Sequence, residues 1–157
     1  MLIKKVIKVL NQRKIPYAIA GGFAVALHGV VRGTVDIDIL IPLEEKYLIQ
    51  TEEALTSLGL VSRIPVDAKN IFQFRLEYIE NKNLKVWSFV NPNLPSEIVD
   101  VMIIYDLTDF KTEKKNSIFG DVIVVSLEDL IKMKQEAGRP QDIADIKSLE
   151  EVLKART

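Results

Sequence analysis

Two carboxylates stand one residue apart in an otherwise apolar segment, Val35-Asp36-Ile37-Asp38-Ile39-Leu40-Ile41. The pattern predicts a strand on which Asp36 and Asp38 project from one side and the isoleucines project from the other. Two like charges held side by side repel each other, which gives a folding chain no advantage. A divalent cation would offset the repulsion, because hard cations are bound by carboxylate oxygens. The acidic pair therefore predicts a metal site.

A Gly-Gly pair, Gly21-Gly22, precedes this strand. The apolar residues around it predict a short buried strand at 17–20, a turn, and a helix at about 22–30. Glycine lets a ligand approach the backbone closely, and a helix N-terminus offers free N–H groups and partial positive charge to a phosphate. A phosphate-binding turn followed by a metal-binding strand indicates a nucleoside triphosphate bound together with its metal.

The two motifs together resemble a known signature. Gly21-Gly22, a spacer of 13 residues and then Asp36-Ile37-Asp38-Ile39 look like the pattern of the nucleotidyltransferase superfamily, which has the DNA polymerase β-like fold. Asp100, on a later apolar segment, matches the third carboxylate of that family, and Arg32-Gly33-Thr34 resembles its Arg-x-Ser/Thr approach. The tail from Lys134 to Asp145 is similar to small bacterial members related to the AbiEii and minimal nucleotidyltransferase groups of toxin–antitoxin systems.

The resemblance implies an α/β (α+β) fold, with a mixed central sheet flanked by helices in a single domain over residues 1–157. It implies attack of an acceptor hydroxyl on the α-phosphate of a nucleoside triphosphate, with release of pyrophosphate. Two Mg²⁺ ions, or Mn²⁺ in their place, would stabilise the attacking and leaving oxygens. The implied catalytic residues and metal ligands are Asp36, Asp38 and Asp100. The implied nucleotide-binding residues are Gly21, Gly22, Arg32, Thr34, Lys134 and Arg139.

Each of these residues also has an ordinary structural explanation. The acidic pair could lie on a solvated strand face, Asp100 could form an ion pair, and the glycines could form a plain turn. Arg32 could form a salt bridge in place of a phosphate contact. Lys134, Arg139, Asp142 and Asp145 could be helix-end charges, since an acid near a helix N-terminus is favoured by the dipole alone.

A few further residues have interpretations of their own. Asp106 is a weaker rival of Asp100 because it falls at the end of that strand. His28 lies on an apolar helix and is interpreted as a hydrogen-bonded core or rim residue rather than a catalyst. At strand spacing, Trp87, Phe72 and Phe74 are interpreted as core or sheet face, with stacking of one of them on a base as the alternative.

Composition narrows the class of protein. A chain of 157 residues with 48% apolar and 27% charged residues is long enough for a sizeable core. A net charge of −1 provides no basic field for a long polynucleotide. With no cysteine and one histidine, disulfides, thiol catalysis and most zinc sites are excluded. Lysines interrupt the apolar N-terminus, and no apolar run approaches the length of a membrane span, so we expect a cytoplasmic protein without membrane contact.

Periodicity and punctuation predict the remaining elements. Apolar spacing over 2–14 predicts an amphipathic helix. Near the C-terminus, Ser126 is a candidate N-cap of a helix, with Asp129 three residues on, and Gly138 ends this second helix. Pro140 opens the last helix. Alternation over 71–79 predicts a strand that forms a hairpin with 84–90. Helices are expected at 2–14, 22–30, 44–58, 126–137 and 140–154, strands at 17–20, 35–41, 71–79, 84–90, 97–104 and 121–125, and a loop or short helix at 106–117.

The resulting hypothesis is a nucleotidyltransferase that modifies a macromolecule. The predicted elements use nearly the whole chain, which leaves little for an acceptor pocket, so a protein or RNA acceptor is preferred to a small molecule. A homodimer that forms a pocket between two copies is an alternative. A different class of function is a binding module that acts as an antitoxin or regulator through a partner protein, such as a toxin. The three carboxylates argue against an inactive enzyme, which would have no use for their repulsion.

Overall fold

The computed structural model describes residues 1–156. Within these residues, no helix is long and apolar enough to cross a bilayer. The elements follow in the order α1 (Leu2–Gln12), β1 (Ala18–Ala20), α2 (Gly21–Leu27), β2 (Ile37–Leu40), α3 (Glu45–Ser57), β3 (Val61–Ser62), α4 (Ala68–Lys82), β4 (Val86–Asn91), β5 (Leu94–Met102), the 3₁₀ turn η1 (Leu107–Asp109), β6 (Thr112–Ser117), β7 (Gly120–Val125), α5 (Leu127–Ala137) and α6 (Pro140–Ala155).

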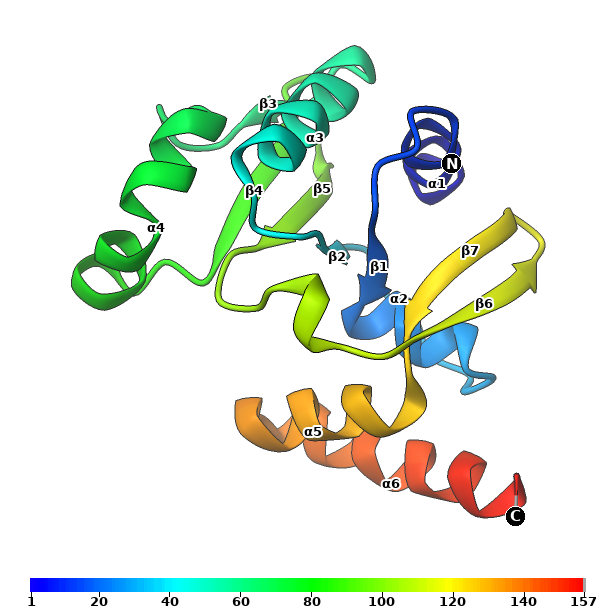
Figure 1. Ribbon diagram of the computed structural model, residues 1–157. Helices are drawn as coiled ribbons and strands as arrows, with labels where there is room; N and C mark the ends of the chain where they lie inside the picture. The colour runs from blue at the N-terminus through cyan, green and yellow to red at the C-terminus, as the bar shows by residue number, and fades with distance from the viewer. Residues whose placement is uncertain (157) are drawn as a thin grey trace.

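A single mixed sheet forms the centre of the fold (Figure 1). Its strand order is β3-β4-β5-β2-β1-β7-β6. The central strand β2 is parallel to β5 and antiparallel to β1, and β1 is parallel to β7. The outer pairs β3–β4, β4–β5 and β6–β7 are antiparallel. The expected mixed sheet flanked by helices is therefore confirmed.

The central strands are buried because most of their side chains are apolar. Ala18–Ala20 are fully buried, as are Ile37 and Ile39 on the neighbouring strand. Helix α1 covers part of this layer with the apolar residues predicted from its spacing, among them Ile3 and Leu10. Because helices cover the faces of such a sheet, polar groups gather at the ends of its strands.

The C-terminal helical hairpin follows the predicted signals. The Ser126 hydroxyl accepts a hydrogen bond from the Asp129 amide at 3.2 Å, which caps α5. Gly138 ends α5 in the left-handed region at φ 64°, where a side chain would be strained. Pro140 is the first residue of α6. The two helices pack against each other below the sheet, as Figure 1 shows.

The strand predicted at 71–79 is wrong, because this segment lies within helix α4. Its apolar residues alternate, but the helix begins with a capping box in which Asp67 and Asn70 each accept a hydrogen bond from the other's backbone amide. Asn83 ends the helix at φ 52°. The capping signal was present in the sequence and outweighs the alternation.

The predicted hairpins change as a consequence. Strand β4 pairs with β5 through a turn at Pro92 and Asn93, so Leu94 and Pro95 belong to a strand and not to the expected loop. The segment 106–117, expected to be a loop or short helix, contains η1 and the edge strand β6. Strand β3, only two residues long, was not predicted. Edge strands are short and polar, so their hydrophobic pattern is weak.

Candidate active site

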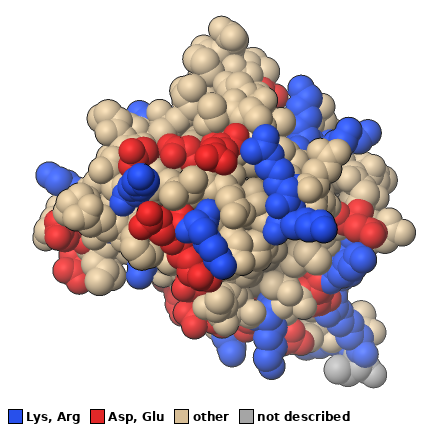
Figure 2. All heavy atoms as spheres, turned by 45° about the horizontal axis from the view of Figure 1, so that its top comes forward, with Lys and Arg blue, Asp and Glu red and all other residues tan. Residues whose placement is uncertain are grey.

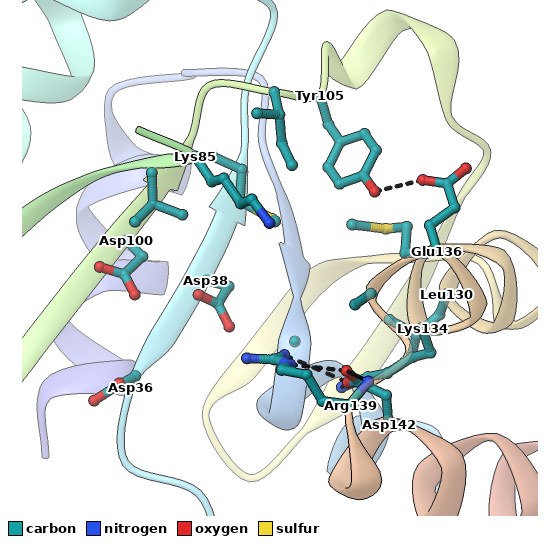
Figure 3. A pocket seen from close by; sticks show the side chains of 16 residues that line it. Asp36, Asp38, Lys85, Asp100, Tyr105, Leu130, Lys134, Glu136, Arg139 and Asp142 are labelled. Atoms are coloured by element: carbon teal, nitrogen blue, oxygen red, sulfur yellow. Dashed lines mark hydrogen bonds and ion pairs between the residues drawn. The ribbon is translucent and has the colours of Figure 1, made fainter. Parts of the chain in front are cut away.

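Two of the predicted carboxylates lie side by side on neighbouring strands. In the parallel pair β2–β5, Asp38 is directly opposite Asp100, and the apolar neighbours Ile37 and Val99 are opposite each other one position earlier. Asp36 immediately precedes β2 and is exposed. Figure 3 shows that all three acids line one pocket. The structure thus brings together the residues that the sequence placed 62 and 64 positions apart.

The carboxylate of Asp38 is costly to ionise in this place. Burial, followed by repulsion from Asp100 and Asp36, raises its pKa from 3.8 to about 7. Lys134 and Arg139 act in the opposite direction. The pKa of Asp100 is also raised, mainly by burial, although its Oδ1 accepts a hydrogen bond from the Ser88 hydroxyl. Repulsion of this kind is typical of sites that bind a cation or move a proton.

The two glycines make room for different groups. Gly21 opens α2 at φ +61°, and a Cβ placed on it would overlap the Asp38 carboxylate. A Cβ on Gly22 would overlap the Arg32 guanidinium and would lie 2.6 Å from the Thr34 hydroxyl. Only Gly21 lines the pocket. The space over Gly22, which the sequence assigned to a phosphate, is filled by this chain's own Arg32 and Thr34.

The structure therefore separates the predicted nucleotide-binding residues into two groups. Gly21, Lys134 and Arg139 line the pocket with the acids. Gly22, Arg32 and Thr34 lie behind it, and Arg32 Nε forms an ion pair with Asp145 at 3.1 Å. Arg32 thus forms the salt bridge that is one of its two interpretations, and its contact with a phosphate stays a prediction.

A basic wall faces the acids from the α5–α6 hairpin. Lys134 is only 6% exposed and forms ion pairs with Asp142 at 3.1 Å and Asp145 at 3.0 Å. Arg139 is largely exposed, binds Asp142 through Nε at 2.8 Å, and points toward Asp38 (Figure 3). The pKa of Asp142 is lowered by its hydrogen bonds with Arg139 and Lys134, although burial opposes the effect. These contacts fix two cations opposite the carboxylates.

The pocket contains residues that the sequence analysis missed. Its volume is about 540 Å³, and Lys85, Tyr105 and Glu136 are among the residues that line it. The Tyr105 hydroxyl donates a hydrogen bond of 2.6 Å to Glu136, 31 positions away, which no local pattern could indicate. Ser88 could have been found, because correct pairing of β4 with β5 places it opposite Asp100.

Other candidates have structural roles. His28 is 5% exposed, and its Nε2 lies 2.8 Å from the Val125 carbonyl oxygen, which confirms a hydrogen-bonded core position. Asp106 caps η1 by accepting a hydrogen bond from the Thr108 amide. Trp87 is fully buried and packs against Phe89 in the core, as expected. The same expectation is wrong for Phe72, which is 47% exposed on helix α4.

The donor set fits a hard divalent cation. Asp36, Asp38 and Asp100 offer only carboxylate oxygens, the ligands that Mg²⁺ prefers. Burial, followed by repulsion from Asp100 and Asp36, raises the pKa of Asp38, and a bound cation would offset this cost of ionisation. Among residues 1–156, however, no three acidic or histidine side chains form a finished metal-binding cluster. The three-ligand metal site thus stays a prediction.

Comparison with solved structures shows the same fold in known nucleotidyltransferases. The crystal structure of ANT(2'')-Ia in complex with adenylyl-2''-tobramycin has a TM-score of 0.66 and 19% identity, and the match covers 99% of this chain and 89% of that one. Lincomycin-bound LnuA, a lincosamide antibiotic adenylyltransferase, has a TM-score of 0.66 and 14% identity, with 96% and 95% covered. An antigenic nucleotidyltransferase-like protein from Paracoccidioides brasiliensis has a TM-score of 0.58 and 18% identity, with 94% and 73% covered.

Sequence comparison identifies the family. Among proteins with curated descriptions, none is significantly similar to this chain. The family model for aminoglycoside-2''-adenylyltransferase matches residues 2–86, more than half of the chain, and this region includes the Gly-Gly turn and the Asp-x-Asp strand. The predicted superfamily is confirmed, whereas the likeness to the AbiEii and minimal nucleotidyltransferase groups stays a prediction. The chain belongs to the aminoglycoside-2''-adenylyltransferase family and is a nucleotidyltransferase.

Proposed function

We propose that this protein transfers a nucleoside monophosphate from a nucleoside triphosphate to a hydroxyl group of a small molecule, with Mg²⁺ as its cofactor. The observation that carries the proposal is the arrangement of charges in one pocket (Figure 3). Figure 2 shows acidic and basic side chains next to each other on the face of the molecule that it presents. Asp38 and Asp100 lie side by side on β2 and β5, and the cations Lys134 and Arg139 face them from α5 and from the N-cap of α6. Acids that hold a metal and bases that neutralise phosphates are the two requirements of phosphoryl transfer.

Each pocket residue has a proposed role. Asp36, Asp38 and Asp100 would hold the metal, which when bound would stabilise charge on the attacking and leaving oxygens. Asp100 would also accept the proton of the acceptor hydroxyl, since its pKa is raised above that of an ordinary aspartate. Lys134 and Arg139 would bind the triphosphate oxygens. Gly21 leaves room for the Asp38 carboxylate, which a Cβ at this position would overlap.

The residues behind the pocket would act through others. Gly22 leaves space for Arg32 and Thr34, and these two lie on the segment that leads into Asp36. Arg32 also binds Asp145, which in turn pairs with Lys134. We therefore assign these three residues a role in positioning Asp36 and Lys134, in place of the direct phosphate contact expected from the sequence.

The structural neighbours favour a small acceptor over the expected macromolecule. The preference for a macromolecule depended on size, since nearly all 157 residues are used by the fold. Yet the structures of ANT(2'')-Ia with adenylyl-2''-tobramycin and of LnuA with lincomycin align with this chain over 89% and 95% of their lengths. A chain of similar size therefore suffices for a small antibiotic. Glu136, an exposed acid that lines the same pocket, would suit an acceptor that carries amino groups.

The test is a transfer assay with purified protein, MgCl₂ and α-labelled nucleoside triphosphates. The acceptor samples are hydroxylated antibiotics, including aminoglycosides and lincosamides, and cell extract separated into small molecules, proteins and RNA. We expect label in a small compound, and a loss of at least about 100-fold in Asp100→Asn. Asp121→Asn, an exposed acid on β7, is the matched control and should retain activity.

The other outcomes separate the alternatives. Label only in protein or RNA would restore the macromolecular acceptor and with it the toxin–antitoxin hypothesis. Absence of transfer from every nucleotide, together with binding of a partner protein, would favour the regulatory binding module.

A further inference from the structure

Helix α4 presents an apolar stripe to solvent. Phe72 and Leu76 are 47% and 61% exposed although they lie one helical turn apart on the same face. The opposite face carries Ile71, Phe74 and Tyr78, which are buried or half-buried toward the body of the protein. Figure 1 shows α4 at the periphery, beside the β3 end of the sheet. Adjacent apolar side chains on an outer helical face form a contiguous patch that another apolar surface can cover.

The charges that flank this stripe have opposite signs at its two ends. Lys69 lies three residues before Phe72, and Glu80 lies four residues after Leu76, so all four side chains share one face of the helix. Lys69 and Glu80 are both exposed. Measured along the axis from position 74, midway between the apolar pair, Lys69 is about 7.5 Å toward one end and Glu80 about 9 Å toward the other.

We propose that this stripe, defined by Lys69, Phe72, Leu76 and Glu80, is the contact between two copies of this chain in an antiparallel α4–α4 pair. A twofold axis near position 74 places each Phe72 against the other copy's Leu76 and each Lys69 against the other copy's Glu80. A parallel pair would instead oppose lysine to lysine and glutamate to glutamate. An interface between identical copies must be self-complementary, and the stripe meets this condition in one orientation only.

Sedimentation equilibrium of the purified protein between micromolar and millimolar concentration tests the proposal. We expect a reversible monomer–dimer equilibrium. Leu76→Glu should raise the dimer dissociation constant by about 100-fold or more, because the residue occurs twice in a symmetric interface. Ile118→Glu is the matched control: Ile118 is 90% exposed on the β6–β7 turn, at the other end of the sheet, and should leave the equilibrium unchanged.

Charge reversal distinguishes this pair from general hydrophobic association. Lys69→Glu and Glu80→Lys should each weaken the dimer, and the double variant should restore it, because the two charges simply exchange places. Circular dichroism confirms that each variant is folded. A protein that is monomeric at every concentration would refute the proposal, and so would a dimer that Leu76→Glu leaves intact or that the double charge exchange fails to restore.

Discussion

Replacing Asp38 by asparagine is expected to stabilise the metal-free protein at neutral and alkaline pH. Folding raises the pKa of this carboxyl from 3.8 to about 7, so the folded protein holds its proton to higher pH than the unfolded chain does. As far as this carboxyl is concerned, the folded protein is therefore most stable below pH 4, and its stability falls as pH rises toward 7.

The magnitude follows from the difference between the two pKa values. At 1.36 kcal/mol for each tenfold change in proton affinity, complete ionisation of Asp38 costs the folded state about 4 kcal/mol. The Asp38→Asn variant would avoid this cost, and it would also remove the repulsion that Asp38 exerts on the Asp100 carboxylate. We expect a gain of about 2–4 kcal/mol at pH 8, which corresponds to a rise in Tm of about 5–15 °C for a chain of this size.

Urea unfolding in EDTA, repeated from pH 4 to pH 8, measures this effect. The free energy of unfolding of Asp38→Asn minus that of the unmodified protein should be near zero at pH 4 and grow by about 1.4 kcal/mol per pH unit until it levels off near pH 7. Asp121→Asn, which replaces an exposed acid, should give a flat difference. A pH-independent difference for Asp38→Asn would show that burial and repulsion at this site are not what the structure indicates.

Two more substitutions test the neighbouring walls of the pocket. Gly21→Ala should cost about 1–3 kcal/mol more stability than Gly29→Ala in urea unfolding. Both positions have positive φ, but only at Gly21 would the new Cβ overlap the Asp38 carboxylate. Equal losses would mean that backbone strain alone causes the effect and that the overlap contributes nothing. Lys134→Met should cost about 3–5 kcal/mol of stability, because it leaves two buried carboxylates on α6 without this partner. Lys132 is exposed, so Lys132→Met should cost less than about 0.5 kcal/mol. Similar losses in the two variants would contradict a buried ion-pair network.

Sequence was sufficient for the parts of the molecule that local chemistry determines. The Asp-x-Asp strand, the Gly-Gly turn and the capped hairpin of α5 and α6 each depend on residues a few positions apart. The alternation of Phe72, Phe74, Leu76 and Tyr78 predicts a strand where the structure has helix α4. In the helix these residues fall on two faces, one exposed and one half-buried, and the capping box at Asp67 is the local signal for the helix.

Long-range pairing explains the rest of what sequence could not supply. The placement of β5 beside β2 brings Asp100 opposite Asp38, and nothing in either segment specifies this neighbour. The network of Lys134 with Asp142 and Asp145 was visible only as a set of helix-end charges, because the burial that turns those charges into ion pairs depends on how α5 and α6 pack. The role assigned to Gly22 changed for the same reason.

The balance of charge in the pocket gives the metal a role in binding as well as in chemistry. Lys134 and Arg139 compensate little of the negative charge of Asp38 and its acidic neighbours, because both are already paired with the acids of α6. The charged residues that line the pocket are Asp36, Asp38, Asp100, Glu136 and Asp142 against Lys85, Lys134 and Arg139. The pocket thus has an excess of carboxylates, and a free nucleoside triphosphate, itself strongly anionic, would be repelled from it.

Calorimetry should therefore detect ATP binding with Mg²⁺ and at least about tenfold weaker binding in EDTA. A tenfold loss of affinity corresponds to an electrostatic cost of about 1.4 kcal/mol for binding ATP without the metal. Equal affinity in both conditions would show that the cationic side chains alone neutralise the phosphates.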